Sequence, residues 1–117
     1  MKDTINNVQP NSSQIELIKQ GLIESCITFN ASIFTPYLLM PEVKTSFPDK
    51  EAFLHYFEYM LNCTKSKSEG ALTLRIENYD SVQGSIFNFY DTVHKFARLT
   101  IIVNETPNEI SFDVSPI

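Results

Sequence analysis

The chain has 117 residues, with 9 lysines and arginines against 14 aspartates and glutamates, so its formal net charge is −5. Its content of 43% hydrophobic and 12% aromatic residues fits one globular domain of ordinary size, which needs neither a disulfide nor a metal ion to fold. The acidic balance argues against a nucleic-acid partner, and the isolated glycines, two histidines and two cysteines exclude a phosphate loop and a zinc finger, so we expect no nucleic acid, metal or cofactor.

The first half of the chain begins with a long predicted helix. Residues 1–12 are polar and unpatterned, as in a flexible arm, and we place a single domain over residues 13–117. Residues 13–16 (S-Q-I-E) have the form of a capping box. Apolar residues then recur at three- and four-residue spacing, which predicts a helix to about residue 31. They are Ile15, Ile18, Leu22, Cys26, Phe29 and Ile33. Gly21 lies inside this helix, either where another backbone packs closely or by chance.

A short helical turn, a short strand and a second helix follow. Two prolines limit residues 32–41 to a helical turn, and residues 42–47 form a plausible edge strand. The second helix opens at residues 48–51, where acidic side chains favour the first turn. It ends before a polar loop over residues 64–70. Its apolar positions again have helical spacing: Phe53, Tyr56, Phe57, Met60 and Leu61.

The second half changes from a period of 3.6 to a period of 2, which predicts antiparallel strands with one buried face. The expected strands are 72–77, 85–92, 96–104 and 110–114, with a turn at residues 80–84 between the first two. The buried face of the first strand consists of Leu72, Leu74 and Ile76. In the second strand one face is shared by Phe87, Phe89, Asp91 and Val93.

This order of elements resembles the nuclear transport factor 2-like superfamily, which has the cystatin-like cone fold and includes polyketide cyclase-like proteins. The phrases F-T-P-Y-L at residues 34–38 and F-P-D-K-E-A-F at residues 47–53 resemble the segments of that family after the first helix and before the second. The resemblance implies an α+β fold in which a curved antiparallel sheet wraps around the long N-terminal helix and the second helix. Such a cone encloses an apolar pocket, and its members include isomerases, dehydratases, cyclases, binding modules and sheet-mediated dimers.

The residues of the family's enzymes are mostly missing here. Isomerase-like members use a tyrosine in the first helix and an aspartate on the first strand, but the predicted helix holds no tyrosine and the strand offers Lys44 and Thr45. Dehydratase-like members use a His–Asp pair. The comparable residues, Asp91 and His94, are three apart, which places them on opposite faces of a strand unless the turn has begun. These departures argue against an enzyme without excluding one.

Asp91 is the candidate catalytic residue. If Phe87 and Phe89 face the cone, Asp91 faces it too, and apolar surroundings would raise the pKa of its carboxyl group towards that of a general base. The alternative is that Asp91 ends the strand in water. Tyr37 and Tyr56 are the candidate tyrosines of the pocket, because the resemblance places their segments beside the cone opening. The expected ligand-binding set is therefore Tyr37, Tyr56, Phe87, Phe89 and Asp91.

The remaining reactive side chains are given structural roles. His55 falls at the boundary of the second helix and His94 in a turn, so solvated histidines are the simpler interpretation. The two histidines and Asp91 lack the spacing of metal ligands. Cys26 lies on the apolar stripe of the first helix, which is typical of a small core residue. We expect Cys26 and Cys63 to be reduced.

Three functional hypotheses remain open. The leading one is a non-catalytic domain that binds a small apolar molecule in its cavity, and the first alternative is an isomerase, dehydratase or cyclase with Asp91 as general base. The second alternative is a dimerisation module without ligand. Depending on strand phase, the outer face of the sheet carries Thr73, Arg75, Ile86, Tyr90, Thr100 and Ile102. Exposed apolar residues there predict a homodimer through that face.

The cellular location is predicted from the lack of a membrane-span pattern and of a secretory-signal pattern. No apolar run approaches the roughly 20 residues of a membrane span, so we expect no membrane partner. The first residues are polar and lack the apolar core of a secretory signal. The sequence therefore predicts a cytoplasmic protein.

Overall fold

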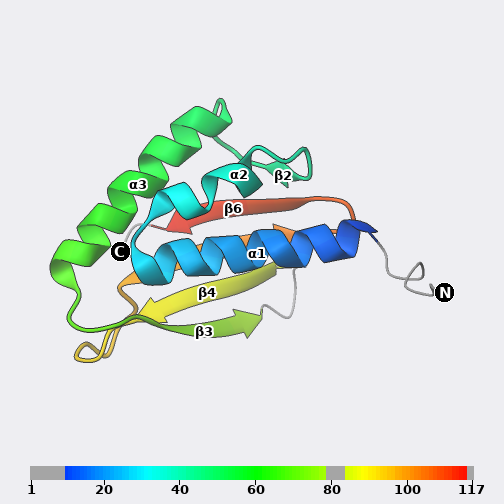
Figure 1. The fold of residues 1–117 in the computed structure, drawn as a ribbon. Helices are drawn as coiled ribbons and strands as arrows, with labels where there is room; N and C mark the ends of the chain where they lie inside the picture. The colour runs from blue at the N-terminus through cyan, green and yellow to red at the C-terminus, as the bar shows by residue number, and fades with distance from the viewer. Residues whose placement is uncertain (1–9, 79–83, 116–117) are drawn as a thin grey trace.

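The computed structural model describes residues 10–78 and 84–115, which form a five-stranded sheet and a layer of helices (Figure 1). In chain order the elements are α1 (Pro10–Thr28), the 3-10 helix η1 (Ala31–Ile33), α2 (Thr35–Leu38), β2 (Val43–Lys44), α3 (Lys50–Lys67), β3 (Thr73–Asn78), β4 (Gly84–Tyr90), β5 (Leu99–Glu105) and β6 (Ile110–Ser115). The α+β class is thus confirmed. Residues 1–9 of the predicted arm and most of the predicted turn at 80–84 lie outside the described residues.

The sheet is open and mixed, with strand order β2-β6-β5-β4-β3. The four long strands pair antiparallel with their neighbours, but β2 runs parallel to β6, with Val43 opposite Ile110. The prediction of a wholly antiparallel sheet is therefore wrong at this edge. The reason lies in the connections, because the chain enters β2 from the helical layer and returns to that layer in α3, so no hairpin imposes an antiparallel direction.

The helix α1 begins three residues before the predicted capping box, so Ser13 lies inside the helix and the predicted cap is wrong. Pro10 is its first residue, a position that suits proline because the N–H of the first turn has no partner in the helix. At the other end Phe29 adopts a left-handed backbone with φ of 56°. The N–H groups of Phe29 and Asn30 donate to the carbonyls of Cys26 and Ser25, which closes the helix in a Schellman motif.

The glycine of α1 marks a close approach by a ring and not by another backbone. A Cβ atom added to Gly21 would lie 2.4 Å from Cδ2 of Tyr37. The predicted backbone contact is therefore wrong, although the inference of tight packing at this position is correct. Tyr37 belongs to α2, so Gly21 lets the short helix lie against the long one.

The helix α3 follows its sequence signals at the start and runs beyond them at the end. Asp49 is its N-cap, and its carboxylate accepts a hydrogen bond from the N–H of Ala52 at 2.8 Å. The helix continues to Lys67, past the predicted start of a polar loop at residue 64. Thr64 is buried and its hydroxyl donates to the carbonyl of Met60 at 2.8 Å, so this polar residue is accommodated within the helix.

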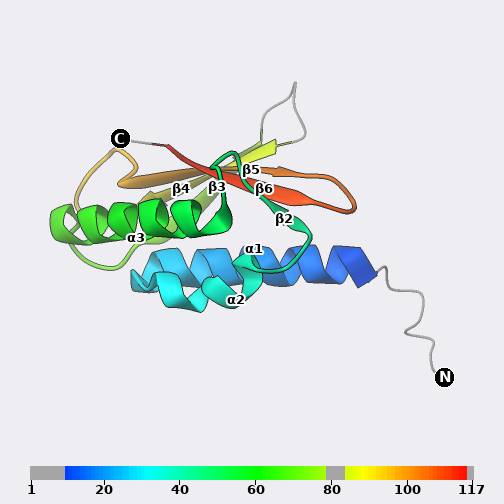
Figure 2. The same cartoon turned by 90° about the horizontal axis from the view of Figure 1, so that it is seen from above.

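The helices cover only one face of the sheet, as the view from above shows (Figure 2). Phe87, Ile101 and Val114 lie in register across β4, β5 and β6, and all are buried under this helical layer. Ile76 continues the same row onto β3 but is 51% exposed. The prediction that Ile76 is buried is therefore wrong, because β3 is an edge strand and Ile76 has a strand neighbour on only one side.

Candidate functional site

The predicted pocket residues are divided between the core and the helical layer. Phe87 and Phe89 point into the core and are buried. Tyr37 and Tyr56 are half-buried on α2 and α3, respectively. The ring of Tyr37 stacks beside that of Phe34, and the ring centroids of Tyr56 and Phe47 lie 5.5 Å apart. The structure therefore brings the two phenylalanines into the core and leaves both tyrosines in the helical layer.

Phenylalanine rings fill the space between the helices and the sheet. Phe34 is fully buried, and its ring centroid lies 5.4 Å from that of Phe112, 5.9 Å from Phe57 and 6.5 Å from Phe53. All three pairs meet edge to face, the arrangement favoured by the charge distribution of aromatic rings. The space around Phe34 is thus packed with aromatic side chains.

Asp91 lies just beyond β4, which ends at Tyr90, and not on the strand as predicted. The strand ends because the carboxylate of Asp91 collects donors from the surrounding loop. Its Oδ1 accepts the N–H groups of Val93 and His94 at 3.1 and 2.7 Å. Its Oδ2 accepts the N–H of Glu69 at 2.9 Å and lies 2.7 Å from Nδ1 of His94. Asp91 therefore fastens the β4–β5 loop to the segment that follows α3.

These contacts give Asp91 the opposite character to a general base. Burial opposes ionisation of the carboxyl group, but the hydrogen bonds from the backbone of His94, from Glu69, from the His94 ring and from Val93 outweigh it and hold the pKa of Asp91 well below its ordinary value. A carboxylate that is this acidic and engaged by four donor groups is a weak proton acceptor. The geometry favours a structural role for Asp91.

His94 forms the His–Asp contact that strand spacing argued against. The sequence allowed this contact only if the turn had begun, and the chain does turn after Tyr90 although the strand was predicted to reach residue 92. The His94 side chain is 39% exposed and sits on the β4–β5 loop near Phe96, which is 79% exposed. Asp91 orients the ring through Nδ1, but the pair lies on a surface loop. The other histidine, His55, is exposed on α3.

The two cysteines are free, with Cys26 buried and Cys63 half-buried. Cys26 is fully buried, and this burial raises the pKa of its thiol well above the usual value. A buried neutral thiol is a poor nucleophile and a good small core residue. This agrees with the structural role predicted for Cys26.

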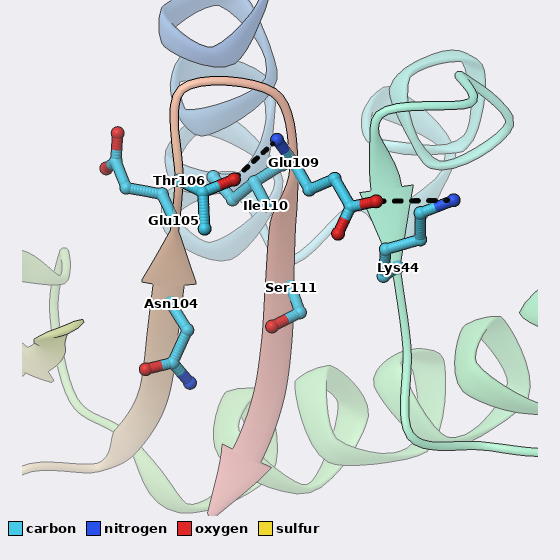
Figure 3. Close-up of a pocket in the computed structure, with 7 residues that line it drawn as sticks. All are labelled: Lys44, Asn104, Glu105, Thr106, Glu109, Ile110 and Ser111. Atoms are coloured by element: carbon cyan, nitrogen blue, oxygen red, sulfur yellow. Dashed lines mark hydrogen bonds and ion pairs between the residues drawn. The ribbon is translucent and has the colours of Figure 1, made fainter. Parts of the chain in front are cut away.

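One groove opens at the β5–β6 hairpin and has a volume of about 190 Å³ (Figure 3). Its lining residues are Lys44, Asn104, Glu105, Thr106, Glu109, Ile110 and Ser111. Nζ of Lys44 lies 4.0 Å from Glu109, and the hydroxyl of Thr106 accepts the N–H of Glu109 at 3.1 Å. Glu105 is held by Lys19 of α1 at 2.8 Å. Most charged side chains of this groove therefore already have a partner within the protein. The volume of the groove is below that of typical ligand sites.

A second groove lies between the end of α1 and α3, with a volume of about 350 Å³. It is lined by Phe29, Asn30, Ala31, Ser32, Glu58, Leu61 and Asn62. Oδ1 of Asn30 accepts hydrogen bonds from both the N–H and the hydroxyl of Ser32. Neither groove contains any of the ligand-binding residues predicted from the sequence.

The described helices leave the outer face of the sheet uncovered (Figure 2). We use this name for the face that carries Thr73, Arg75, Ile86, Tyr90, Thr100 and Ile102. The sequence left the strand phase open, and the structure has the phase that turns these residues outward, because the alternate residues Phe87, Phe89, Leu99 and Ile101 are buried in the core.

Apolar and polar contacts alternate across the outer face. Ile86 lies directly opposite Ile102 at its centre. Beside this pair the guanidinium of Arg75 lies 4.8 Å from the centroid of the Tyr90 ring, a cation–π contact. The hydroxyl of Thr100 donates to the Asn88 side chain at 2.7 Å. The outer face thus has an apolar centre with ordered polar groups around it.

Comparison of the chain with models of protein families, with the curated proteins and with the solved structures found no match. Within residues 10–78 and 84–115, no helix has the length and apolar character needed to cross a bilayer. In the same part of the chain, no three side chains of His, Cys, Asp or Glu are grouped to hold a metal ion. The site must therefore be argued from its geometry.

Proposed function

We propose that this domain is a protein-interaction module that pairs with a second copy of itself through the outer face of its sheet. The observation that carries the proposal is the one-sided architecture, in which α1, α2 and α3 all cover the same face (Figure 2). A sheet with one face left bare and apolar residues at the centre of that face is a natural interaction surface. A second copy supplies the same face, so the contact is isologous.

The composition of the outer face supports this use. Ile86 and Ile102 form a cross-strand pair, and Tyr90 adds an aromatic ring of the kind enriched at protein interfaces. Arg75 is positioned over Tyr90, and an ordered arginine loses less conformational freedom on binding than a mobile one. The apolar pair at the centre provides burial, while the surrounding polar groups set orientation.

The core supports the proposal over the two alternatives. A small apolar ligand needs a cavity, and the rings around Phe34 fill the space between the layers. An enzyme that uses Asp91 needs a carboxylate free to accept a proton, and Asp91 is engaged by four donor groups. The resemblance to the nuclear transport factor 2-like superfamily stays a hypothesis, and it implies sheet-mediated dimers of the same kind. A cytoplasmic location is likewise part of this proposal.

Light scattering coupled to size-exclusion chromatography tests the outer-face contact. The monomer has a mass of 13.4 kDa, and we expect the wild type to elute with at least twice that mass. The variant Ile102→Lys places a charge at the centre of the contact in both copies and should raise the dissociation constant about 100-fold or more. The control Leu39→Lys removes an apolar side chain that is 67% exposed at the end of α2, and it should leave the mass unchanged. A wild type that elutes as a monomer at all concentrations contradicts the proposal, as does an Ile102→Lys variant that keeps the mass of the wild type.

A further inference from the structure

We propose that the free edge of β3 pairs antiparallel with β3 of a second copy, centred on Ile76, so that the two five-stranded sheets join into one. This inference concerns a different surface from the outer-face contact and does not rest on it. It starts from the position of β3 at the end of the strand order, where it pairs only with β4 among the described residues. The opposite edge of β3 therefore presents backbone N–H and carbonyl groups to a partner strand.

Four side chains of β3 are exposed to solvent. Thr73, Arg75, Ile76 and Glu77 are all exposed. Ile76 is the informative one, since it continues the buried row of Phe87, Ile101 and Val114 and yet is 51% exposed. A second Ile76 placed opposite would extend that apolar row across the junction of the two sheets. The exposure of Ile76 is thus accounted for by a partner strand.

The pleat and the charges of β3 select one register. In a continuous antiparallel sheet, a two-fold axis perpendicular to the sheet relates the two β3 strands and keeps the inner face of each copy on the same side. Residues opposite each other must then lie on the same face. Because faces alternate along a strand, the axis must pass between two copies of the same residue. An axis at Arg75 would place two arginines opposite each other, and an axis at Glu77 would place two glutamates opposite each other. An axis at Ile76 places Arg75 opposite the Glu77 of the partner, twice by symmetry. Unlike charges face each other only in this last case.

The two charges are available for such pairing. Within the described residues, neither Arg75 nor Glu77 has an ion-pair partner. The residues opposite them on β4 are Asn88 and Ile86, which are uncharged. Edge strands commonly carry charges that prevent pairing with other chains. The alternation of a cation and an anion around Ile76 has the reverse effect, because it is self-complementary about a two-fold axis. Exposed pairs contribute modestly to affinity, but they discriminate between registers.

Disulfide trapping tests the register directly. Across an antiparallel pair the Cβ atoms of opposite residues lie about 5 Å apart, within reach of a disulfide with little backbone movement. We expect Ile76→Cys, in a Cys63→Ser background, to form a covalent dimer rapidly under mild oxidation. The control Leu74→Cys lies on the same face, two residues from the axis, so the two copies of its thiol would be about 14 Å apart. Because Ile76 lies on the inner face, this result does not depend on the outer-face contact.

Charge exchange provides an independent test of the same register. Arg75→Glu and Glu77→Arg each create like-charge pairs and should each raise the dissociation constant about 30-fold. The double variant restores unlike pairs and should return to within about threefold of the wild type, although it no longer places a guanidinium over the Tyr90 ring. These measurements use the Ile102→Lys background, in which the outer-face contact is removed. Equal crosslinking of Ile76→Cys and Leu74→Cys would overturn the proposal, and so would a double variant as weak as the single ones.

Discussion

Replacing Phe34 with alanine removes the central ring of the aromatic cluster. Phe34 is fully buried, and its ring packs against those of Phe53, Phe57 and Phe112. A buried phenylalanine-to-alanine substitution costs about 3–5 kcal/mol, which combines the reduced burial with the cavity left behind. Four ring contacts, including that with Tyr37, place Phe34→Ala in the upper half of this range, at about 4 kcal/mol. That is a large part of the roughly 5–15 kcal/mol expected for the whole domain.

Urea unfolding followed by circular dichroism measures this cost as the difference in free energy of unfolding. The control is Phe96→Ala, because Phe96 is 79% exposed and its removal should change stability by no more than about 0.5 kcal/mol. Benzene gives a second readout, since it binds dry apolar cavities and stabilises a protein by mass action. It should stabilise Phe34→Ala and leave the wild type unchanged. A cost below about 1 kcal/mol for Phe34→Ala, or a wild type stabilised by benzene, would refute the inference that phenylalanine rings fill the core.

Three further predictions concern the backbone, a close approach and the buried carboxylate. Phe29 has a positive φ, so Phe29→Gly should be more stable than Phe29→Ala by about 1 kcal/mol in urea unfolding, and equal stabilities would argue against the left-handed backbone. Gly21→Ala should destabilise the protein, because the clash with Tyr37 costs about 1–3 kcal/mol against a gain in helix propensity of about 1 kcal/mol; in a Tyr37→Ala background the sign should reverse. The pKa of Asp91 is lowered by folding, so the stability it contributes is fully present above its ordinary pKa of 3.8 and is lost as the pH falls below that value. Thermal melts should therefore show Asp91→Asn less stable than the wild type at neutral pH, with the gap narrowing below pH 3.8; a constant gap would contradict the role assigned to the carboxylate.

The elements with strong periodicity were predictable from the sequence. The apolar stripe of α1, the start of α3 near residues 48–51 and the alternation along β4 and β5 all follow from local spacing. Such patterns suffice because the side-chain period of a helix or strand fixes which face is buried once the core side is known.

The features that depend on element ends and on neighbouring strands were not predictable. Asp91 was predicted to lie on a strand because no local pattern shows that β4 stops at Tyr90. The Asp91–His94 contact forms only because the chain turns after Tyr90. The exposure of Ile76 depends on β3 being an edge strand, which is a property of the strand order. The contact of Phe34 with Phe112 likewise depends on packing between residues far apart in the chain.

Intermolecular nuclear Overhauser effects in a sample mixed from isotope-labelled and unlabelled protein test the outer-face contact most directly. The account predicts effects between copies at the methyl groups of Ile86 and Ile102, which face solvent in the monomer and the partner in the dimer. The methyl groups of Leu22, fully buried in the core, should show none. A sample that is dimeric by mass yet lacks intermolecular effects at Ile86 and Ile102 would contradict the account, and a sample that is monomeric at the concentrations of the experiment would do the same.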